Sequence, residues 1–265
     1  MTNRNPLLYH AASSYYSMIA RYALLLAGEA FESRVMDIHK KREQLKPWYA
    51  AINPAMTVPT LIDASRSFNS SKAILDHAVQ VAPDRWLENC CSQSVVSQVQ
   101  RLVELHYCFE VERLTFNALM EKLPPLRVLF PMLLRKVSKS LQAQMQQPKA
   151  DTTALEAKIA VTQSRIDYFA RPLAARQAEQ IELAKQLIAA FPAKPAGSWL
   201  FGELPSRADV VLLVFLARLS AIGLNNASIV APPLSNWFKQ KTHTSAFLKA
   251  DVWVKFHPWR LITHR

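Results

Sequence analysis

The stretch from Asn53 to Ala78 constrains the fold of this chain more than any other, and the pair Val58-Pro59 lies at its centre. Proline cannot donate a hydrogen bond to a sheet. Pro59 therefore belongs at the entrance or bend of the short apolar strand that begins at Thr60, where a cis peptide bond is compatible with proline. Such a bend leaves the backbone of Val58 able to pair with another group. The sequence predicts a bent strand that offers its backbone to a ligand.

The same stretch ends in the start of a helix. Asn69-Ser70-Ser71 is a polar cluster, and the apolar residues Ala73, Ile74 and Leu75 follow it. This pattern is typical of a polar N-cap that opens an apolar helix, whose first backbone N–H groups suit an anion. A bent strand beside such a helix start predicts a binding site for a peptide-like ligand that carries a carboxylate.

Composition limits the class of protein. Half of the 265 residues are apolar, which is enough for one large domain or two modest ones. The longest apolar run, Val210 to Ala217, is far shorter than the roughly 18 residues that a membrane-spanning helix needs. The polar start Met1 to Asn5 lacks the apolar segment of a signal peptide, and three cysteines without framework spacing favour a reducing compartment. We expect a cytoplasmic globular protein.

The net charge of +12 raises the question of an anionic partner. The excess is mainly C-terminal, and the segment from Lys122 to Lys149 has six basic residues and no acidic one. Nucleic-acid binding is not favoured, because no helix-turn-helix, zinc-ligand or RNP-type motif accompanies the charge. No metal site is expected either, since His106 and Cys108 are two apart on a helix and face different sides.

Strands and helices alternate only in the first third of the chain. Hydrophobic periodicity predicts strands over 7–10, 31–38, 60–62 and 65–68, with a tight turn at 63–64, and helices from Ser14 to Gly28, over 42–52 with an interruption at Pro47, and over 71–79. Ala82-Pro83-Asp84 is the best domain boundary, because only helices are predicted after it. They cover 92–123, 126–145, 151–190 with a kink at Pro172, and 206–221, where Ser206 and Asp209 have capping-box spacing.

Many motifs in a fixed order support a resemblance to a known family. In chain order they are Leu8-Tyr9, Ser14, Arg21, Pro47-Trp48, Asn53-Pro54, Val58-Pro59-Thr60-Leu61, Ser71-Lys72-Ala73-Ile74, Phe201-Gly202-Glu203, Ser206 and Ala208-Asp209. The chain resembles the glutathione S-transferase superfamily. The turn from Leu8 to Ser17 is similar in spacing to zeta-class enzymes. It resembles still more the ganglioside-induced differentiation-associated proteins, and bacterial β-etherase and dehalogenase relatives are also compatible.

The resemblance implies an α/β thioredoxin-like N-terminal domain over residues 1–82, which would bind glutathione, and an all-α C-terminal bundle over 86–265, enlarged around 122–190. It implies that the Val58 backbone, ahead of Pro59, pairs with the cysteinyl part of glutathione, and that Ser71 holds the γ-glutamyl carboxylate. Otherwise Pro59 only shapes the strand and Ser71 only caps the helix. Ser70 stands where the family usually has an acidic residue or Gln for the ligand's ammonium group. A neutral hydroxyl there weakens that contact by about 1–2 kcal/mol.

By the same resemblance, Ser14 occupies the catalytic serine position, and Tyr16 stands where zeta enzymes have cysteine. A hydroxyl at the start of a helix stabilises a thiolate and lowers its pKa. The alternatives are that Ser14 is a plain N-cap and that Tyr15 and Tyr16 pack against the second domain. Arg21 and His10 are expected to be structural.

Two functions follow. The first is a glutathione transferase-like enzyme, a homodimer that uses glutathione as co-substrate and attacks a small-molecule electrophile held by the helical domain, with Tyr107 and Phe116 as candidate lining. The second is a catalytically weak binding protein on the same fold that associates with anionic partners or a membrane surface. For the basic helix over 126–145, a core-facing helix with a solvated basic face is favoured over peripheral membrane contact.

Overall fold

Four strands form one mixed sheet in the computed structural model, which describes residues 5–148 and 151–257. The strands β1 (Leu7–His10), β2 (Glu32–Val35), β3 (Thr60–Asp63) and β4 (Arg66–Phe68) have the order β2-β1-β3-β4. β1 is parallel to β2 and antiparallel to β3, so that Leu8 lies opposite both Ser33 and Leu61. A helical crossover between β1 and β2 makes the parallel pairing feasible. Met1–Arg4 and Lys149, which the sequence arguments include, lie outside the described residues.

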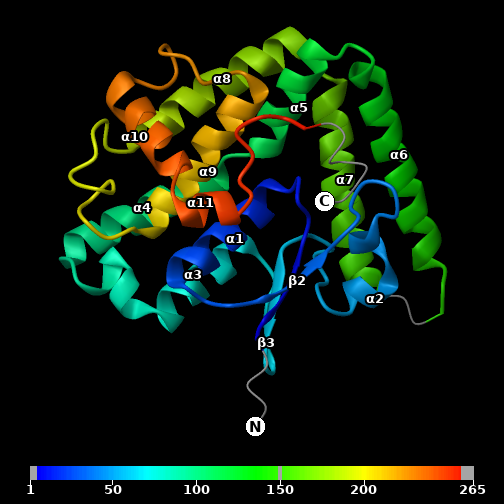
Figure 1. Cartoon of the computed structure of the whole chain (residues 1–265). Helices are drawn as coiled ribbons and strands as arrows, with labels where there is room; N and C mark the ends of the chain where they lie inside the picture. Colours follow the sequence, from blue (N-terminus) through cyan, green and yellow to red (C-terminus); the bar gives the residue numbers. More distant parts are fainter. Residues whose placement is uncertain (1–4, 149–150, 258–265) are drawn as a thin grey trace.

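Three α-helices accompany the sheet: α1 (Tyr15–Ala27), α2 (Pro47–Ala50) and α3 (Ser71–Val81), with a 3₁₀ turn, η1, over Glu43–Leu45. α1 and α3 pack against each other and against the sheet (Figure 1). Two expectations need correction. Pro47 opens α2 instead of interrupting a helix, because its missing N–H is harmless at the first helical position. The turn between β3 and β4 lies at Ala64 and Ser65, one residue later than predicted.

The rest of the described chain is helical. Short 3₁₀ turns over Pro83–Arg85 and Leu87–Asn89 lead into eight helices: α4 (Gln93–Cys108), α5 (Val111–Lys122), α6 (Leu126–Met145), α7 (Thr152–Ala170), α8 (Leu173–Ala190), α9 (Arg207–Ile222), α10 (Pro232–Thr242) and α11 (Ser245–Lys249). The predicted helix over 92–123 is broken at Phe109 and Glu110. The predicted helix over 151–190 is divided at Pro172, not merely kinked, because Arg171 is extended, as residues before proline tend to be.

α9 lies at the centre and joins the two parts of the chain. All residues from Ala208 to Leu219 are buried, and α9 contacts α1, α3, α4 and α5. The predicted capping box is confirmed: the Ser206 N–H donates to the Asp209 carboxylate at 2.8 Å, and the Asp209 N–H donates to the Ser206 hydroxyl. The most apolar helix of the sequence is thus the common core of both parts.

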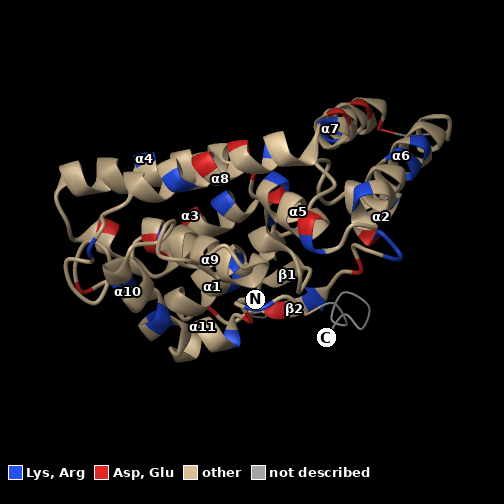
Figure 2. Ribbon diagram, turned by 90° about the horizontal axis from the view of Figure 1, so that it is seen from above, with Lys and Arg blue, Asp and Glu red and all other residues tan. Residues whose placement is uncertain are grey.

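The hairpin of α6 and α7 reaches across to the sheet domain (Figures 1 and 2). Leu141 and Leu155 of the hairpin pack with Leu45 and Met56, and the Lys158 ammonium donates to the Met56 carbonyl at 3.0 Å. The predicted bounds of the basic helix agree with α6. The prediction that its apolar residues face the core is wrong for Val128, Leu129 and Leu133, which lie largely exposed. In the described ranges no helix is long and apolar enough to cross a bilayer.

Candidate functional site

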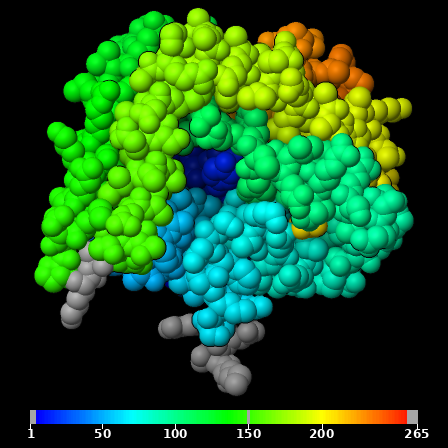
Figure 3. Space-filling model, turned by 180° about the vertical axis from the view of Figure 1, so that it is seen from behind, coloured from blue at the N-terminus to red at the C-terminus, as the bar shows by residue number. Residues whose placement is uncertain are grey.

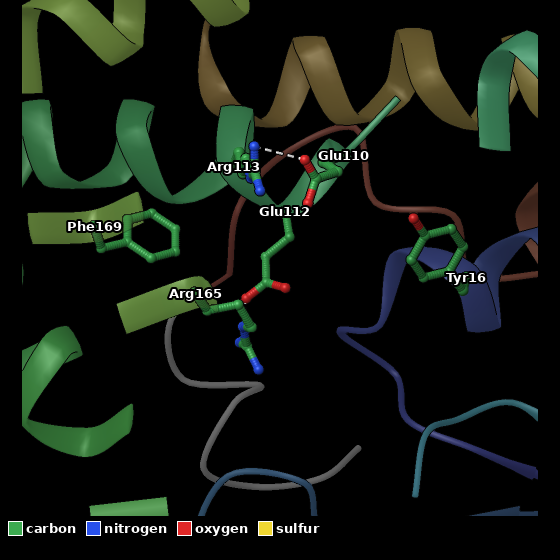
Figure 4. A pocket seen from close by; sticks show the side chains of 6 residues that line it. All are labelled: Tyr16, Glu110, Glu112, Arg113, Arg165 and Phe169. Atoms are coloured by element: carbon green, nitrogen blue, oxygen red, sulfur yellow. Dashed lines mark hydrogen bonds and ion pairs between the residues drawn. The ribbon is translucent and has the colours of Figure 1, made fainter. Parts of the chain in front are cut away.

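The molecule is hollowed between its two domains. Figure 3 shows a central hollow whose floor has the dark blue of the first residues and whose walls have the colours of the sheet domain, of α4 and α5, and of α7 and α8. Where α1, α5 and α7 meet, a cavity of about 160 Å³ is lined by Tyr16, Glu110, Glu112, Arg113, Arg165 and Phe169 (Figure 4). Both domains therefore contribute to one cavity.

Charged pairs dominate the far wall of this cavity. Arg113 pairs with Glu110 at 2.7 Å, and Arg165 pairs with Glu112. The Tyr16 hydroxyl faces the side on which the two glutamates lie (Figure 4). Burial, and then the negative charges of Glu112 and Glu110, raise the pKa of Tyr16 to about 12. Tyr16 is thus a neutral phenol near pH 7.

Ser14 is the N-cap of α1. Its half-buried hydroxyl accepts a hydrogen bond from the Ser17 N–H at 3.3 Å. The interpretation of Ser14 as an N-cap is confirmed. The cap uses the Ser14 hydroxyl only as an acceptor, so its proton remains available for donation. A donor therefore remains at the positive end of the α1 dipole.

Arg218 of α9 lies against the residues that begin α1. Its guanidinium donates to the Ser13 carbonyl at 3.3 Å and lies 5.5 Å from the centre of the Tyr15 ring. The side chain is 9% exposed, and no carboxylate of the described residues pairs with it. Burial lowers the pKa of Arg218 to about 10, so the group remains a cation at neutral pH. Sequence reasoning missed this residue because it is embedded in the nearly continuous apolar pattern of α9.

Tyr15 and Tyr16 both contact the helical domain, as one of the alternatives predicted. The Tyr15 hydroxyl lies 2.6 Å from Nε2 of the buried His106. The Tyr16 ring stacks on Tyr107, with 6.2 Å between centroids and 14° between planes. The start of α1 is therefore held against α4 by three rings and an imidazole.

The peptide bond between Val58 and Pro59 is cis, as expected. Two side chains fix the preceding turn: the Tyr49 hydroxyl and the Asn53 amide both donate to the Thr57 carbonyl, at 2.7 and 2.9 Å. Within the described residues, neither the N–H nor the C=O of Val58 has a hydrogen-bond partner. The carbonyl of Thr57 is held by two side chains, and the backbone groups of the next residue, Val58, are unpaired. Such a fixed and unpaired backbone suits an extended ligand.

Ser70 and Ser71 have different roles. Ser70 is the N-cap of α3 and accepts from the Ala73 N–H at 3.1 Å, so the expectation that Ser71 provides the cap is wrong. Ser71 is the first helical residue and is buried, and its hydroxyl lies 2.9 Å from the Tyr107 hydroxyl. No sequence pattern indicates this contact, because it joins two elements that are distant in the chain.

The remaining candidates are structural. Arg21 donates to the Ala250 carbonyl at 2.7 Å and to His10, whose burial lowers its pKa to about 3. Phe116 stacks on Phe130 inside a hydrophobic cluster of α5, α6 and α7 and is absent from the cavity lining. The described part of the chain holds no group of three or more His, Cys, Asp or Glu side chains suited to a metal ion.

Comparison with known proteins gives a family match for the first part of the chain. Residues 8–86 match the family described as "Glutathione S-transferase, N-terminal domain". No curated protein sequence matched the chain. Many solved structures have a similar fold.

Three of these structures illustrate the likeness. The theta class glutathione S-transferase from Xanthomonas axonopodis pv. citri with glutathione bound is 16% identical, with a TM-score of 0.61 over 93% of this chain and 97% of that one. Ure2p in complex with glutathione is also 16% identical, with a TM-score of 0.59 over 95% and 94%. The glutathione S-transferase from Xylella fastidiosa is 19% identical, with a TM-score of 0.57 over 93% and 97%. The TM-scores, over most of each chain, show a common fold: a thioredoxin-like α/β domain followed by a helical region.

Proposed function

We propose that the protein binds glutathione and activates its thiol for attack on a small electrophile, because residues 8–86 match the glutathione S-transferase N-terminal domain family and the chain has the fold of solved glutathione S-transferases. The occurrence of three features together in the segment that matches this family carries the proposal: the unpaired backbone of Val58, the buried Ser71 at the start of α3 and the half-buried Ser14 at the start of α1. Two of the structural neighbours have glutathione bound.

In this proposal the tripeptide is held mainly by backbone. The Val58 N–H and C=O exchange hydrogen bonds with the cysteinyl residue, and the cis Pro59 orients them. The γ-glutamyl carboxylate accepts from Ser71 and from the first N–H groups of α3, which also carry the positive end of the helix dipole. Both anchors need little from the side chains, which fits the low sequence identity to the neighbours.

Activation is a shift of the thiol equilibrium towards thiolate. Ser14 donates its free proton to the sulfur, and the α1 dipole and the Arg218 cation add positive potential at the same helix end. The thiol proton leaves to solvent, the thiolate forms a C–S bond with the electrophile, and the leaving group departs with the bonding electrons. Tyr16, although a catalytic candidate by alignment, is assigned to the wall of the electrophile pocket, because its pKa of about 12 makes it difficult to ionise.

The electrophile would occupy the cavity between Tyr16 and Phe169. The division of the chain into a glutathione-binding domain over 1–82 and a substrate-binding domain over 86–265 belongs to the same proposal. So do a homodimeric state and a cytoplasmic location, which the resemblance and composition favour.

A second function is favoured by Ser70. Its hydroxyl already accepts one hydrogen bond as the N-cap of α3, and it carries no negative charge for the ligand's ammonium group. A chain that binds glutathione weakly and catalyses poorly would be a binding protein on the transferase fold.

Thermal unfolding with and without glutathione separates these cases. Ligand at one hundred times its Kd stabilises a protein by about 2.7 kcal/mol, which raises the Tm by several degrees. We expect this shift with millimolar glutathione, its loss in Ser71→Ala, and its retention in the control Ser67→Ala, which alters an exposed serine of β4. A shift without conjugation of a chlorodinitrobenzene would support the binding protein, and no shift at all would reject the proposed glutathione-dependent enzyme.

A further inference from the structure

The outer face of α6 is apolar in its first half. Val128, Leu129, Met132 and Leu133 are 65%, 50%, 56% and 48% exposed. The opposite face of α6 is the buried one, because Leu134 and Leu141 pack against residues of α7. α6 therefore exposes four large apolar side chains on consecutive turns, although its other face already serves the core.

Basic residues continue the same face. Arg135, Lys136 and Lys139 are exposed and follow Met132 at spacings of three, four and seven, so they lie on the same side of the helix. No acidic residue occurs anywhere in α6, and Figure 2 shows its charged positions in blue. An apolar patch is thus bordered by a cluster of positive charge.

α6 lies at the edge of the molecule. In Figure 3 the green of α6 forms the outer rim, and the yellow-green of α7 separates it from the hollow. A large flat partner could contact α6 without closing the hollow. This surface is therefore independent of the site that we assign to glutathione.

We propose that the outer face of α6 binds the surface of an anionic lipid bilayer. Val128, Leu129, Met132 and Leu133 enter the boundary between head groups and acyl chains, and Arg135, Lys136 and Lys139 contact lipid phosphates and carboxylates. Charge complementarity selects this occupant. A second copy docked face to face would bring two clusters of like charge together, and a nucleic acid offers no apolar partner for the four exposed side chains.

The test is cosedimentation of the full-length chain with lipid vesicles. One set of vesicles contains phosphatidylcholine only, and the other contains phosphatidylcholine mixed with phosphatidylserine. We expect binding to the mixed vesicles, weakening as salt is added, and little binding to the neutral ones. Binding to neither set overturns the proposal, and so does equal binding to both.

Variants locate the surface. Leu129→Ser with Leu133→Ser removes apolar contacts at exposed positions and should abolish binding, whereas Leu248→Ser, at a residue of α11 that is 64% exposed, should not change it. Arg135→Gln with Lys139→Gln should weaken binding about fivefold per charge, whereas the exposed control pair Lys194→Gln with Lys249→Gln should not. Unchanged binding of the α6 variants overturns the proposal.

The oligomeric state completes the test. Light scattering should give the same mass for the wild type and the Leu129→Ser, Leu133→Ser variant. If the wild type binds no vesicles and the variant dissociates into smaller species, the face is an interface between copies of the chain and the lipid proposal is wrong.

Discussion

The hydroxyl of Tyr107 lies 2.9 Å from the hydroxyl of Ser71, so a residue of α4 contacts the first residue of α3. Either hydroxyl can donate in the free protein. Once a carboxylate accepts the single Ser71 proton, Tyr107 must become the donor, because Ser71 then has only lone pairs left for it. If glutathione binds as proposed, the helical domain takes part in holding a ligand that contacts the sheet domain.

Tyr107→Phe should therefore weaken glutathione binding. The lost hydrogen bond corresponds to about 1 kcal/mol, or roughly a fivefold rise in Kd. Titration calorimetry measures it. Ser71→Ala should cost more, since it removes the direct contact.

The two substitutions should not be additive. Once Ser71→Ala has removed the Ser71 hydroxyl, Tyr107 has no hydroxyl left to hold, so Tyr107→Phe should then cost little. The coupling energy between the two substitutions should be about 0.5–1.5 kcal/mol. Additive effects within about 0.3 kcal/mol would show that Tyr107 does not act through Ser71.

Ser14→Ala tests activation of the thiol. Loss of one preorganised donor should lower kcat/KM for conjugation by about 10²–10³ while glutathione affinity changes little. The loss of the N-cap should also cost about 1 kcal/mol of stability. Tyr16→Phe is the matched control and should retain most activity, because its hydroxyl stays neutral. The reverse ranking of the two variants would move the catalytic role to Tyr16.

Arg218→Met tests the buried cation. Removing a positive charge beside the start of α1 should raise the pKa of the bound thiol by about one unit. The control Arg101→Met changes an exposed arginine of α4 and should leave that pKa unchanged. Equal pKa values in both variants would assign Arg218 to packing against Tyr15.

Stability should fall in mild acid because of two buried histidines. Burial lowers the pKa of His10 and of His106 to about 3, whereas the unfolded chain protonates its histidines near 6.5. Between these pH values the unfolded state binds more protons than the folded state. The free energy of unfolding is therefore not reduced by these histidines above pH 6.5. As the pH falls below 6.5, the free energy of unfolding decreases by about 1.4 kcal/mol per pH unit for each histidine.

His106→Gln isolates this effect and preserves a hydrogen-bond partner for Tyr15. Denaturant unfolding between pH 5 and 7.5 should show a shallower pH slope than in the wild type, whereas the exposed control His243→Gln should not. Asp209 has the opposite effect on the pH dependence of stability, since burial raises its pKa to about 6. Its effect is the same in the wild type and in the variants, so it drops out of the comparison between them. An unchanged slope in His106→Gln would contradict the assignment.

Local patterns predicted much of the fold. α6 is bounded as the periodicity indicated, and the capping box of α9 follows from the spacing of Ser206 and Asp209. The break at Phe109 is not evident from the sequence, because the apolar residues on both sides of it follow one helical period. Neither glycine nor proline marks the break. Propensity alone does not show where tertiary packing ends a helix.

Residues of the candidate site were predictable only where a motif identifies them. Val58, Pro59 and Ser71 follow from proline and N-cap chemistry together with the resemblance, whereas Tyr107 and Arg218 approach the site from distant helices. The exposure of Leu129 was also hidden, because an apolar residue in an amphipathic helix is expected to face the core.

Thiolate absorbance of bound glutathione tests at once whether this chain binds glutathione and whether it ionises the thiol. Glutathione is titrated with pH in the presence of saturating protein. We expect a thiol pKa at least one unit below that of free glutathione, and a return towards the free value in Ser14→Ala. A bound thiol that titrates as in free glutathione, or a failure to bind glutathione at all, would overturn the proposed function.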